Sequence, residues 1–400
     1  MKKLLLLSVL FVGIFALSAC GREQAQGVSD TRVVVGNTAA TSGGLAFVGG
    51  PFRDAMIAYF NMVNEQGGVA GREIAYIQYD DGFDGAQGLA LTQRLVEDDQ
   101  VFALVGHFGT PTVGATRDYL NDIGIPRVYY ATGISALFNP EAEGGARASF
   151  PVQPIFDAEG EVMVARAVGS LGASSVGVIY TNDDAGRGLL NGIRIRSEML
   201  GVNLTEAQVA PDASDMSTAA QSMLSANVDV ILIAANQVPA SVAARALAAA
   251  GSSTPVVTSY VNADATWLTL VEEVLGSFDV YASAWIDVLG SPDDLNSFVT
   301  EVSKIDPALA GNAFAFAGWI AAATFVEGLR RVGEDDLTWE SFIDAMESAP
   351  IELPFGVVVD YANNRRVGTQ AMAFLKAGST DGVLAWETIN PIQTITDILE

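Results

Sequence analysis

Short apolar strand patterns alternate with amphipathic helix patterns along most of this chain, and this alternation restricts its fold more than any other feature. The first series runs from "TRVVVG" at 31–36 to "IPRVYYA" at 125–131, with helix patterns between the strand patterns. Strands of four to seven residues separated by helices predict βαβ units in which helices cover both faces of a parallel sheet. We therefore expect an α/β fold with a doubly wound parallel sheet.

The same order begins again near residue 157, which predicts a second, similar lobe. Its strand patterns run from "SVGVIYT" at 175–181 to "PVVTSY" at 255–260. The two series also share a local phrase of strand, acidic pair, glycine and helix, at 76–90 and at 177–192. The segment "ASFPVQP" at 148–154 has two prolines and no helix pattern, so we expect the chain to cross there from one lobe to the other.

The N-terminus has the pattern of a secretory signal. Lys2 and Lys3 precede an uncharged apolar run that is too short to span a bilayer, which predicts a signal peptide over residues 1–19. The run ends in Leu-Ser-Ala-Cys, which resembles the lipobox of bacterial lipoproteins and implies lipidation of Cys20. Cys20 is the only cysteine, so no intramolecular disulfide can form. Residues 20–30 then form a lipidated tether. The alternative is an ordinary secretory signal followed by an incidental cysteine.

Charge and hydropathy exclude two classes of partner or location. The formal net charge is −26, and such a chain repels phosphate backbones, which argues against nucleic-acid binding. The most apolar later stretch, 313–329, is bounded by Glu327 and Arg330 and has the length of a buried core helix rather than of a membrane span.

Motifs for catalysis, cofactors and metals are absent from the sequence. There is no phosphate loop, no nucleophile elbow, and no zinc motif, and His107 is the only histidine. The stretch 80–91 partly matches a calcium loop, but Gly82 and Leu91 stand where calcium ligands are needed. We expect its carboxylates to cap a helix instead. The sequence predicts no cofactor, no metal and no catalytic residue.

Two loops that follow neighbouring strands are rich in Thr, Ser and Gly. They are "GHFGTPTVGA" at 106–115 and "YYATGISALF" at 129–138. Thr110 before Pro111 is typical of a helix N-cap and first residue. Ligands bind at the carboxyl edge of open α/β sheets, so these loops are candidates for ligand binding. Ordinary turn chemistry between strand and helix explains the same residues, and the pattern alone does not decide.

Four phrases in this order resemble the branched-chain amino-acid-binding family of ABC-importer substrate-binding proteins, which have the type I periplasmic-binding fold. They are "NEQGGVAGREIAYIQYDDGFDGAQGLALTQRLVEDDQVFALVGHFGT", "YYATGISAL", "VIYTNDDAGRGLLNG" and "AFAFAGWIAAATFVEGLRR". The resemblance covers residues 31 to about 380. It implies two lobes joined by a three-segment hinge, with 31–152 plus 286–355 as lobe 1 and 153–285 plus 356–400 as lobe 2.

The resemblance also implies a ligand site between the lobes and a structural role for His107. An aromatic lid at Phe47 and a second aromatic at Phe314 would face hydroxyl and backbone groups of the two loops. Amino-acid binders of the family often carry Tyr at the position of Ala185 and Glu at a position near Tyr260. This chain has Ala185 instead and no acidic residue after Tyr260 until Asp264, so we expect a roomier pocket for an amino acid, amide, carboxylate or aromatic acid. The candidate ligand-binding residues are Phe47, Phe108, Gly109, Thr110, Ala131, Thr132, Gly133, Ser135, Asp183, Ala185, Asn236, Tyr260 and Phe314.

We therefore expect a non-enzymatic solute receptor outside the cytoplasm, held at the membrane by its lipid and delivering its ligand to the permease and ATPase subunits of an ABC importer. We expect it to act as a monomer. One alternative is a lipoprotein of the same fold that senses a ligand or regulates a partner protein. Another is an envelope hydrolase, which would need a nucleophile within reach of His107.

Overall fold

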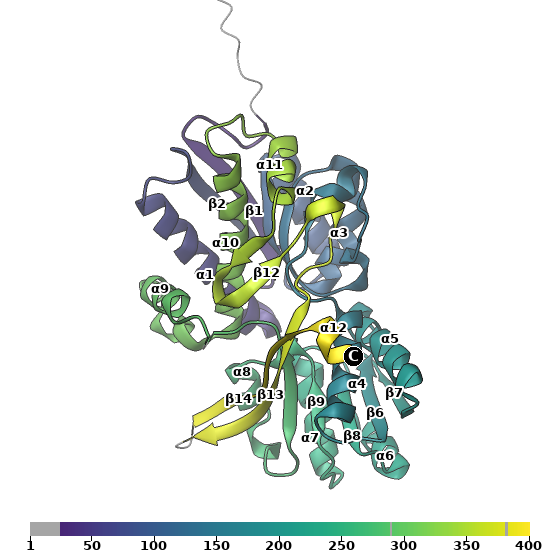
Figure 1. Cartoon of the computed structure of the whole chain (residues 1–400). Helices are drawn as coiled ribbons and strands as arrows, with labels where there is room; N and C mark the ends of the chain where they lie inside the picture. Colours follow the sequence, from purple (N-terminus) through teal and green to yellow (C-terminus); the bar gives the residue numbers. More distant parts are fainter. Residues whose placement is uncertain (1–24, 289, 381–382) are drawn as a thin grey trace, which may run out of the picture.

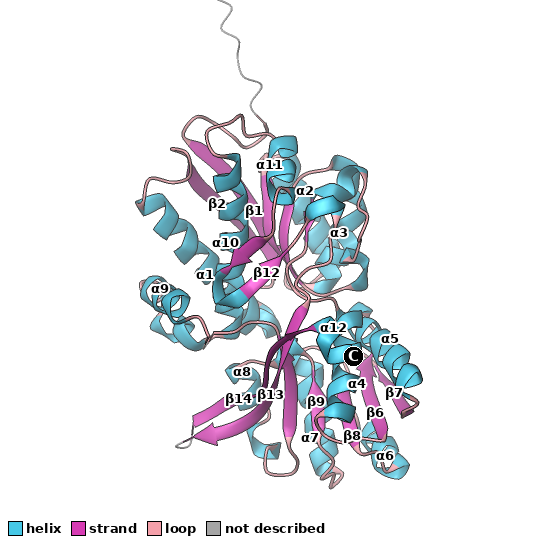
Figure 2. Cartoon of the chain, in the orientation of Figure 1, coloured by secondary structure: helices cyan, strands magenta, loops and turns pink. Residues whose placement is uncertain are grey.

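The computed structural model describes residues 25–288, 290–380 and 383–400. The expected signal peptide and the lipidation site at Cys20 lie outside the described residues. Within the described residues, no helix has the length and hydropathy needed to cross a membrane. The elements form two lobes, each built around one sheet, which lie one above the other in Figures 1 and 2.

The first lobe has a five-stranded parallel sheet in the order β2-β1-β3-β4-β5. Helices flank this sheet in pairs, because α1 packs against α10 and α2 packs against α3. The strands are β1 (Arg32–Ala39), β2 (Glu73–Asp80), β3 (Ala103–Phe108), β4 (Arg127–Ala131) and β5 (Ser149–Phe150). The helices are α1 (Ala46–Glu65), α2 (Gly85–Glu97), α3 (Thr110–Ile123), α9 (Pro292–Val302), α10 (Ala313–Val332) and α11 (Trp339–Glu347).

The second lobe has a seven-stranded sheet in the order β14-β13-β10-β9-β8-β6-β7. Five strands are parallel, and the C-terminal hairpin of β13 and β14 adds two antiparallel strands that the expected parallel sheet does not include. The strands are β6 (Ser175–Thr181), β7 (Asn203–Val209), β8 (Val230–Ala234), β9 (Val256–Thr258), β10 (Val280–Ala284), β13 (Ala371–Thr380) and β14 (Val383–Thr394). The helices are α4 (Phe156–Gly169), α5 (Asp184–Leu200), α6 (Ser217–Ala226), α7 (Gln237–Ala249), α8 (Ala265–Leu270) and α12 (Ile395–Leu399).

Three segments join the lobes. The first follows β5, the second follows β10, and the third precedes β13; the first and third run side by side, where the Thr369 N–H donates to the Val152 carbonyl over 2.8 Å. A small antiparallel sheet of β11 (Ile351–Leu353) and β12 (Val357–Val359) spans the lobe boundary that we expect at residue 355. Because Arg366 still pairs with Asn139 of the first lobe, the chain crosses after Arg366.

Local sequence signals account for the ends of several helices. Asp84 caps α2 by accepting a hydrogen bond from the Gln87 N–H, as expected for the carboxylates of 80–91. Gly124 and Gly201 end α3 and α5 in the left-handed conformation that favours glycine. Helix α3 begins at Thr110, but the residue in the N-cap position is Gly109, at φ 92°, rather than Thr110.

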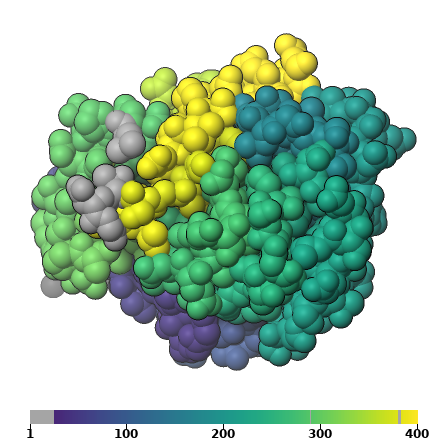
Figure 3. Space-filling view, turned by 90° about the horizontal axis from the view of Figure 1, so that it is seen from below, coloured from purple at the N-terminus to yellow at the C-terminus, as the bar shows by residue number. Residues whose placement is uncertain are grey.

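The core follows the apolar patterns of the sequence. The stretch 313–329 lies in α10, and nearly all of its residues are buried, as expected for a core helix. The C-terminal residues form a band across the surface in the view from below (Figure 3). The shorter 3-10 helices are Gly43–Leu45, Ser135–Leu137, Gly144–Ala148, Tyr260–Asn262, Glu272–Val274, Pro307–Gly311, Pro354–Gly356 and Ala362–Asn364.

Candidate functional site

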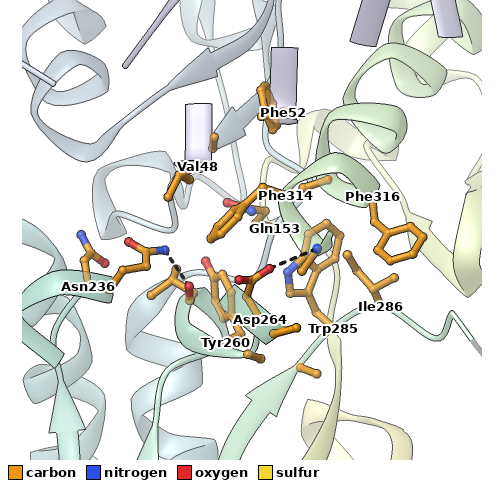
Figure 4. Close-up of a pocket in the computed structure, with 18 of the residues that line it drawn as sticks. Val48, Phe52, Gln153, Asn236, Tyr260, Asp264, Trp285, Ile286, Phe314 and Phe316 are labelled. Atoms are coloured by element: carbon orange, nitrogen blue, oxygen red, sulfur yellow. Dashed lines mark hydrogen bonds between the residues drawn. The ribbon is translucent and has the colours of Figure 1, made fainter. Parts of the chain in front are cut away.

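A cavity of about 390 Å³ lies between the lobes and is the candidate functional site (Figure 4). The first lobe contributes residues from α1, the start of α3, the end of β4 and the start of α10. The second lobe contributes the starts of α7 and α8 and the strands of its C-terminal hairpin. All three crossing regions adjoin these elements, so the cavity sits where a change in the angle between the lobes would open or close it.

The hydroxyl groups of Thr110 and Thr132 meet at the carboxyl edge of the first sheet. Their oxygen atoms are 2.8 Å apart, and both residues line the cavity. Gly109 is needed before Thr110 for two reasons: its φ is 92°, and an added Cβ would lie 3.0 Å from the ring of Phe83. The expected pair of hydrogen-bonding loops is therefore present at one edge of the sheet.

Two neighbouring strands change direction just before this edge. Gly106 of β3 and Tyr129 of β4 both have positive φ, at 69° and 63°. Glycine adopts this conformation freely, but for tyrosine it is a strained one. The strain at Tyr129 places its buried ring next to Phe52 and Trp285, with ring centroids 5.7 and 6.4 Å away. Phe52 and Trp285, which line the cavity, thus pack against a strained aromatic residue.

Aromatic and aliphatic side chains make up most of the cavity wall. Trp285 follows β10 on the second crossing, and Phe314 lies at the start of α10 (Figure 4). On the hairpin, Trp386 stacks on Trp267 with centroids 6.3 Å apart. The remaining apolar residues of the wall include Leu45, Val48, Phe52, Phe83, Phe108, Phe156, Ile286, Val288, Phe316, Leu375 and Leu384. Such a surface favours an apolar ligand body.

Fewer polar than apolar groups line this cavity, and the charged side chains among them are acidic. Gln153 on the first crossing and Asn236 at the start of α7 offer side-chain amides. Asp264 and Asp287 are the charged residues that line the cavity; among the described residues, no basic side chain does. A ligand carboxylate would therefore rely on hydroxyl, amide and helix N-terminal groups.

Asp264 connects the two lobes within the cavity. Its Oδ1 atom accepts hydrogen bonds from the backbone N–H groups of Thr266 and Trp267, which caps α8 of the second lobe. Its Oδ2 atom accepts from the Ala313 N–H at the start of α10, in the first lobe, over 3.2 Å. Asp264 is almost fully buried. One side chain thus caps α8 and also accepts a hydrogen bond from the first residue of α10, whose own N-cap is Asn312.

Glu159 supports the loop that carries Tyr260. Its carboxyl oxygens accept from the Tyr260 N–H over 2.6 Å and from the Ser259 hydroxyl over 2.7 Å. Burial raises the pKa of Glu159 to about 8, against an ordinary value of 4.5. The group is therefore mostly protonated at neutral pH, and it stabilises the cavity wall as a neutral hydrogen-bonding group.

His107 is buried and does not reach the cavity. The Thr116 hydroxyl donates to the Thr112 carbonyl, so it accepts from the His107 Nε2–H over 2.8 Å. Burial, with a smaller effect of the Arg127 charge, lowers the pKa of His107 to about 3. A neutral imidazole without access to a ligand has a structural role, as expected from the resemblance.

The structure brings most of the candidate residues together, and five lie elsewhere. Phe47 is half-buried against the core, while its neighbours Leu45 and Val48 line the cavity. Asp183 caps α5, and Ala185 is buried within that helix. The residues that do line the cavity are Phe108, Gly109, Thr110, Ala131, Thr132, Asn236, Tyr260 and Phe314.

Gly133 and Ser135 lie beside the cavity rather than in its wall. Gly133 packs against the first crossing: its carbonyl accepts from the Phe156 N–H, and an added Cβ would lie 2.6 Å from the Pro154 carbonyl oxygen. The Ser135 hydroxyl donates to the Asp157 carboxylate of α4 in a separate groove. Both residues contact the second lobe directly; Gly133 is buried there, whereas Ser135 stays exposed and lines the separate groove rather than the cavity.

Sequence reasoning missed the cavity residues of the crossings and of the hairpin. Gln153, Trp285, Asp264 and Trp386 were not candidates, although Asp264 is the first acidic residue after Tyr260. The Ser-Thr-Asp-Gly sequence at 379–382 is a hairpin signal, and alternation in the following strand places Leu384 and Trp386 on one face. That signal could have identified the hairpin, but not its position in the cavity.

Metal binding has no support in the described residues. Residues 25–288, 290–380 and 383–400 contain no group of three or more His, Cys, Asp or Glu side chains placed to hold a metal ion. The carboxylates of Asp80 and Asp81 instead accept hydrogen bonds within their own turn and from the neighbouring loops.

Comparisons with known proteins agree with this architecture. The periplasmic binding protein family model matches residues 32–382. A curated amino acid binding protein from Pseudomonas aeruginosa is 32% identical over 146 residues, a region that is 35% of this chain and 36% of that relative. The match therefore spans only about a third of the relative's length.

Solved structures share the fold at low sequence identity. A fatty acid ABC transporter substrate-binding protein from Thermomonospora curvata has a TM-score of 0.82 at 19% identity, covering 95% of this chain and 96% of that one. A leucine-binding protein from Thermotoga maritima has a TM-score of 0.76 at 17% identity, covering 90% and 99%. With a family model that matches most of its length, the chain belongs to the periplasmic binding protein family.

Proposed function

We propose that this protein is a solute receptor that encloses a small ligand between its lobes and delivers it, unchanged, to an ABC importer. The cavity between the lobes is the observation that carries the proposal. Thr110 and Phe314 line it from the first lobe, and Asn236 and Tyr260 line it from the second. A ligand that contacts both lobes at once favours the closed form over the open form, which is how such proteins signal that they are loaded.

The cavity wall supports a ligand with an apolar body and a small hydrogen-bonding head. Thr110, Thr132 and Gln153 are suited to the head, while Trp285 and Trp386 would cover the body. Apolar and aromatic amino acids, amides, aromatic acids and fatty acids all fit this description. Because no basic side chain of the described residues lines the cavity, we propose that hydrogen bonds rather than an ion pair hold an acidic head.

Mass spectrometry of ligand released from the purified protein tests this proposal, followed by thermal unfolding with members of those four classes. We expect at least one to raise the melting temperature saturably. Phe314→Ala and Thr110→Val should weaken binding about tenfold or more, since each removes a buried contact. Met199→Ala, an exposed position outside the cavity, should leave binding unchanged. Absence of both a released ligand and any stabilising compound would contradict the proposal.

The cellular setting is part of the same proposal. We place the protein outside the cytoplasm, attached through Cys20, and acting as a monomer with a permease and ATPase as partners. Uptake of the identified ligand should be lost when the gene is deleted and restored by the wild-type chain. Normal uptake in the deletion strain, together with altered expression or activity of another envelope protein, would favour the sensor alternative.

A further inference from the structure

Phe83 is an aromatic residue of the loop between β2 and α2, and it reaches the cavity between the lobes. Its half-buried ring packs against Gly109, because a Cβ atom added to that glycine would lie 3.0 Å from Cε2 and 3.1 Å from Cδ2 of Phe83. Gly109 directly precedes Thr110, whose hydroxyl oxygen is 2.8 Å from that of Thr132. The Phe83 ring therefore borders the end of the cavity where these two hydroxyl groups meet.

The backbone of Phe83 is held in a conformation that residues with a side chain seldom adopt. Gly82 and Phe83 are both left-handed, with φ of 57° and 68°. For phenylalanine this conformation is unfavourable, and it persists only where the surroundings fix it. The Asp80 carboxylate accepts a hydrogen bond from the Gly82 N–H over 3.1 Å. The Asp81 carboxylate accepts from the Phe83 N–H over 2.9 Å, so the turn holds the ring against Gly109.

Asp81 also ties this turn to the start of α3. Its side chain is fully buried, and its Oδ2 atom accepts a hydrogen bond from the Thr112 hydroxyl over 2.8 Å. Thr112 lies in the first turn of α3, two residues after Thr110. Helix α2 packs closely on the same turn, because a Cβ atom added to Gly85 would lie 2.8 Å from the Pro111 carbonyl oxygen. The ring therefore cannot move away from the Thr110 hydroxyl unless these contacts break.

This arrangement limits the groups that can reach the hydroxyls of Thr110 and Thr132. A ligand atom that forms a hydrogen bond there lies beside the Phe83 ring, which offers no hydrogen-bond partner of its own. A carboxyl or primary amide group is flat and small, whereas an alkyl group added to this head needs room that the ring occupies. In a fitted pocket, a single added methylene changes affinity by about tenfold or more. Phe83 is therefore placed to select ligands by the size of their head.

We propose that Phe83 is a specificity-determining residue, which restricts the ligand to a small hydrogen-bonding head such as a carboxyl or a primary amide. Asp81 and Thr112 are positioning residues, because they act on the ligand only through the ring that they hold in place. This role rests on the proposed solute-binding function and adds to it the size of the head group.

Calorimetric binding of matched probe pairs tests the proposal. The probes are octanamide and 3-phenylpropanamide, each compared with its N-isopropyl derivative, which is larger at the head but keeps an N–H donor and the carbonyl acceptor. These heads are uncharged, which suits a cavity that no basic side chain of the described residues lines. We expect the wild-type chain to bind each primary amide about tenfold or more tightly than its derivative. In Phe83→Ala this ratio should fall to about threefold or less, because the derivatives gain room.

Phe314→Ala is the matched control, because it removes the same side chain from another part of the cavity wall. It should weaken binding of both members of a pair and leave their ratio as in the wild type. Thr112→Val removes the hydroxyl that holds Asp81, so it should lower the ratio as Phe83→Ala does. Thr112→Ser keeps a hydroxyl at this position and should keep the wild-type ratio.

An unchanged ratio in Phe83→Ala, or an equal fall in Phe314→Ala, would overturn the proposal. A wild-type chain that binds neither primary amide, or that binds the larger derivatives equally well, would overturn it too. A wild-type ratio in Thr112→Val would remove the positioning role of Asp81 and Thr112. Each of these results leaves the receptor function standing if the purified protein releases a ligand, so the two proposals fail separately.

Discussion

Glu159 and His107 are both fully buried, and their pKa values are displaced in opposite directions. Glu159 holds its proton in the folded state up to about pH 8, while the unfolded chain loses it near 4.5. Stability from this group is therefore present at low pH and declines as the pH rises from about 4.5 to 8. His107 has the opposite effect on stability. The unfolded chain binds a proton at His107 below about pH 6.5, whereas the folded chain binds it only below about pH 3, so stability declines as the pH falls between these values.

We predict that Glu159→Gln removes most of the loss of stability between about pH 5 and pH 8. Glutamine keeps the shape and remains neutral, so the variant should be close to wild type at pH 5 and more stable at pH 8 by on the order of 1–3 kcal/mol. Urea unfolding at a series of pH values measures this difference. Glu198→Gln, at an exposed position in α5, is the control and should leave the pH dependence as it is. Parallel wild-type and Glu159→Gln profiles would contradict the prediction.

The elements that bear the site follow closely from their sequence patterns. Strand β6 spans the expected residues 175–181, and α10 covers the expected core helix. Apolar periodicity and turn residues specify such local structure. The sequence patterns did not predict the antiparallel hairpin β13–β14, because the edge strand that it joins depends on the route of the third crossing. The strained φ of Tyr129 did not follow either, since only packing around its ring imposes it.

Asp264 caps α8 and also accepts a hydrogen bond from the first residue of α10 across the cleft, and this arrangement predicts an effect on lobe closure. Asp264→Asn keeps an oxygen for the Thr266 and Trp267 N–H groups but turns an N–H donor toward the Ala313 N–H. We expect the ligand-free variant to populate a more open form, with a larger radius of gyration in small-angle X-ray scattering. The cost in stability should be about 1 kcal/mol, as for other lost caps.

Asp84→Asn is the control for this prediction, because Asp84 caps α2 within the first lobe alone. Its loss of stability should be similar or smaller, and its radius of gyration should match the wild type. If both variants scatter like the wild type, the Asp264 contact has no influence on the angle between the lobes.

At the scale of the whole molecule, the sequence predicted the two lobes and one edge of the site. Thr110 and Thr132 could be placed because neighbouring parallel strands end at the same edge of a sheet. Trp285 and Trp386 could not, because they reach the cavity only through the folding of a crossing and a hairpin onto a distant helix. Gly133 and Ser135 were expected in the site, but Gly133 packs against the first crossing and Ser135 faces a separate groove.

The proposed membrane attachment also concerns the whole chain, and we predict that Cys20→Ala prevents it. The thiol carries the proposed lipid, and stable anchoring requires acyl chains. Detergent phase partitioning should find most wild-type protein in the detergent phase and most of the variant in the aqueous phase. Ser18→Ala, which keeps the cysteine, should partition like wild type. A Cys20→Ala protein that stays in the detergent phase would exclude lipidation of this residue as the anchor.

The hydrogen bond from the Ala313 backbone N–H to Asp264 joins the two lobes directly, through protein groups alone. A direct contact between the lobes lowers the free energy that a ligand must supply to favour the closed form, so a weakly binding ligand can still be held. The same contact would slow ligand release, because the lobes cannot separate there until it breaks. Tight retention of a scarce ligand and rapid release of an abundant one thus place opposite requirements on the Asp264 carboxylate.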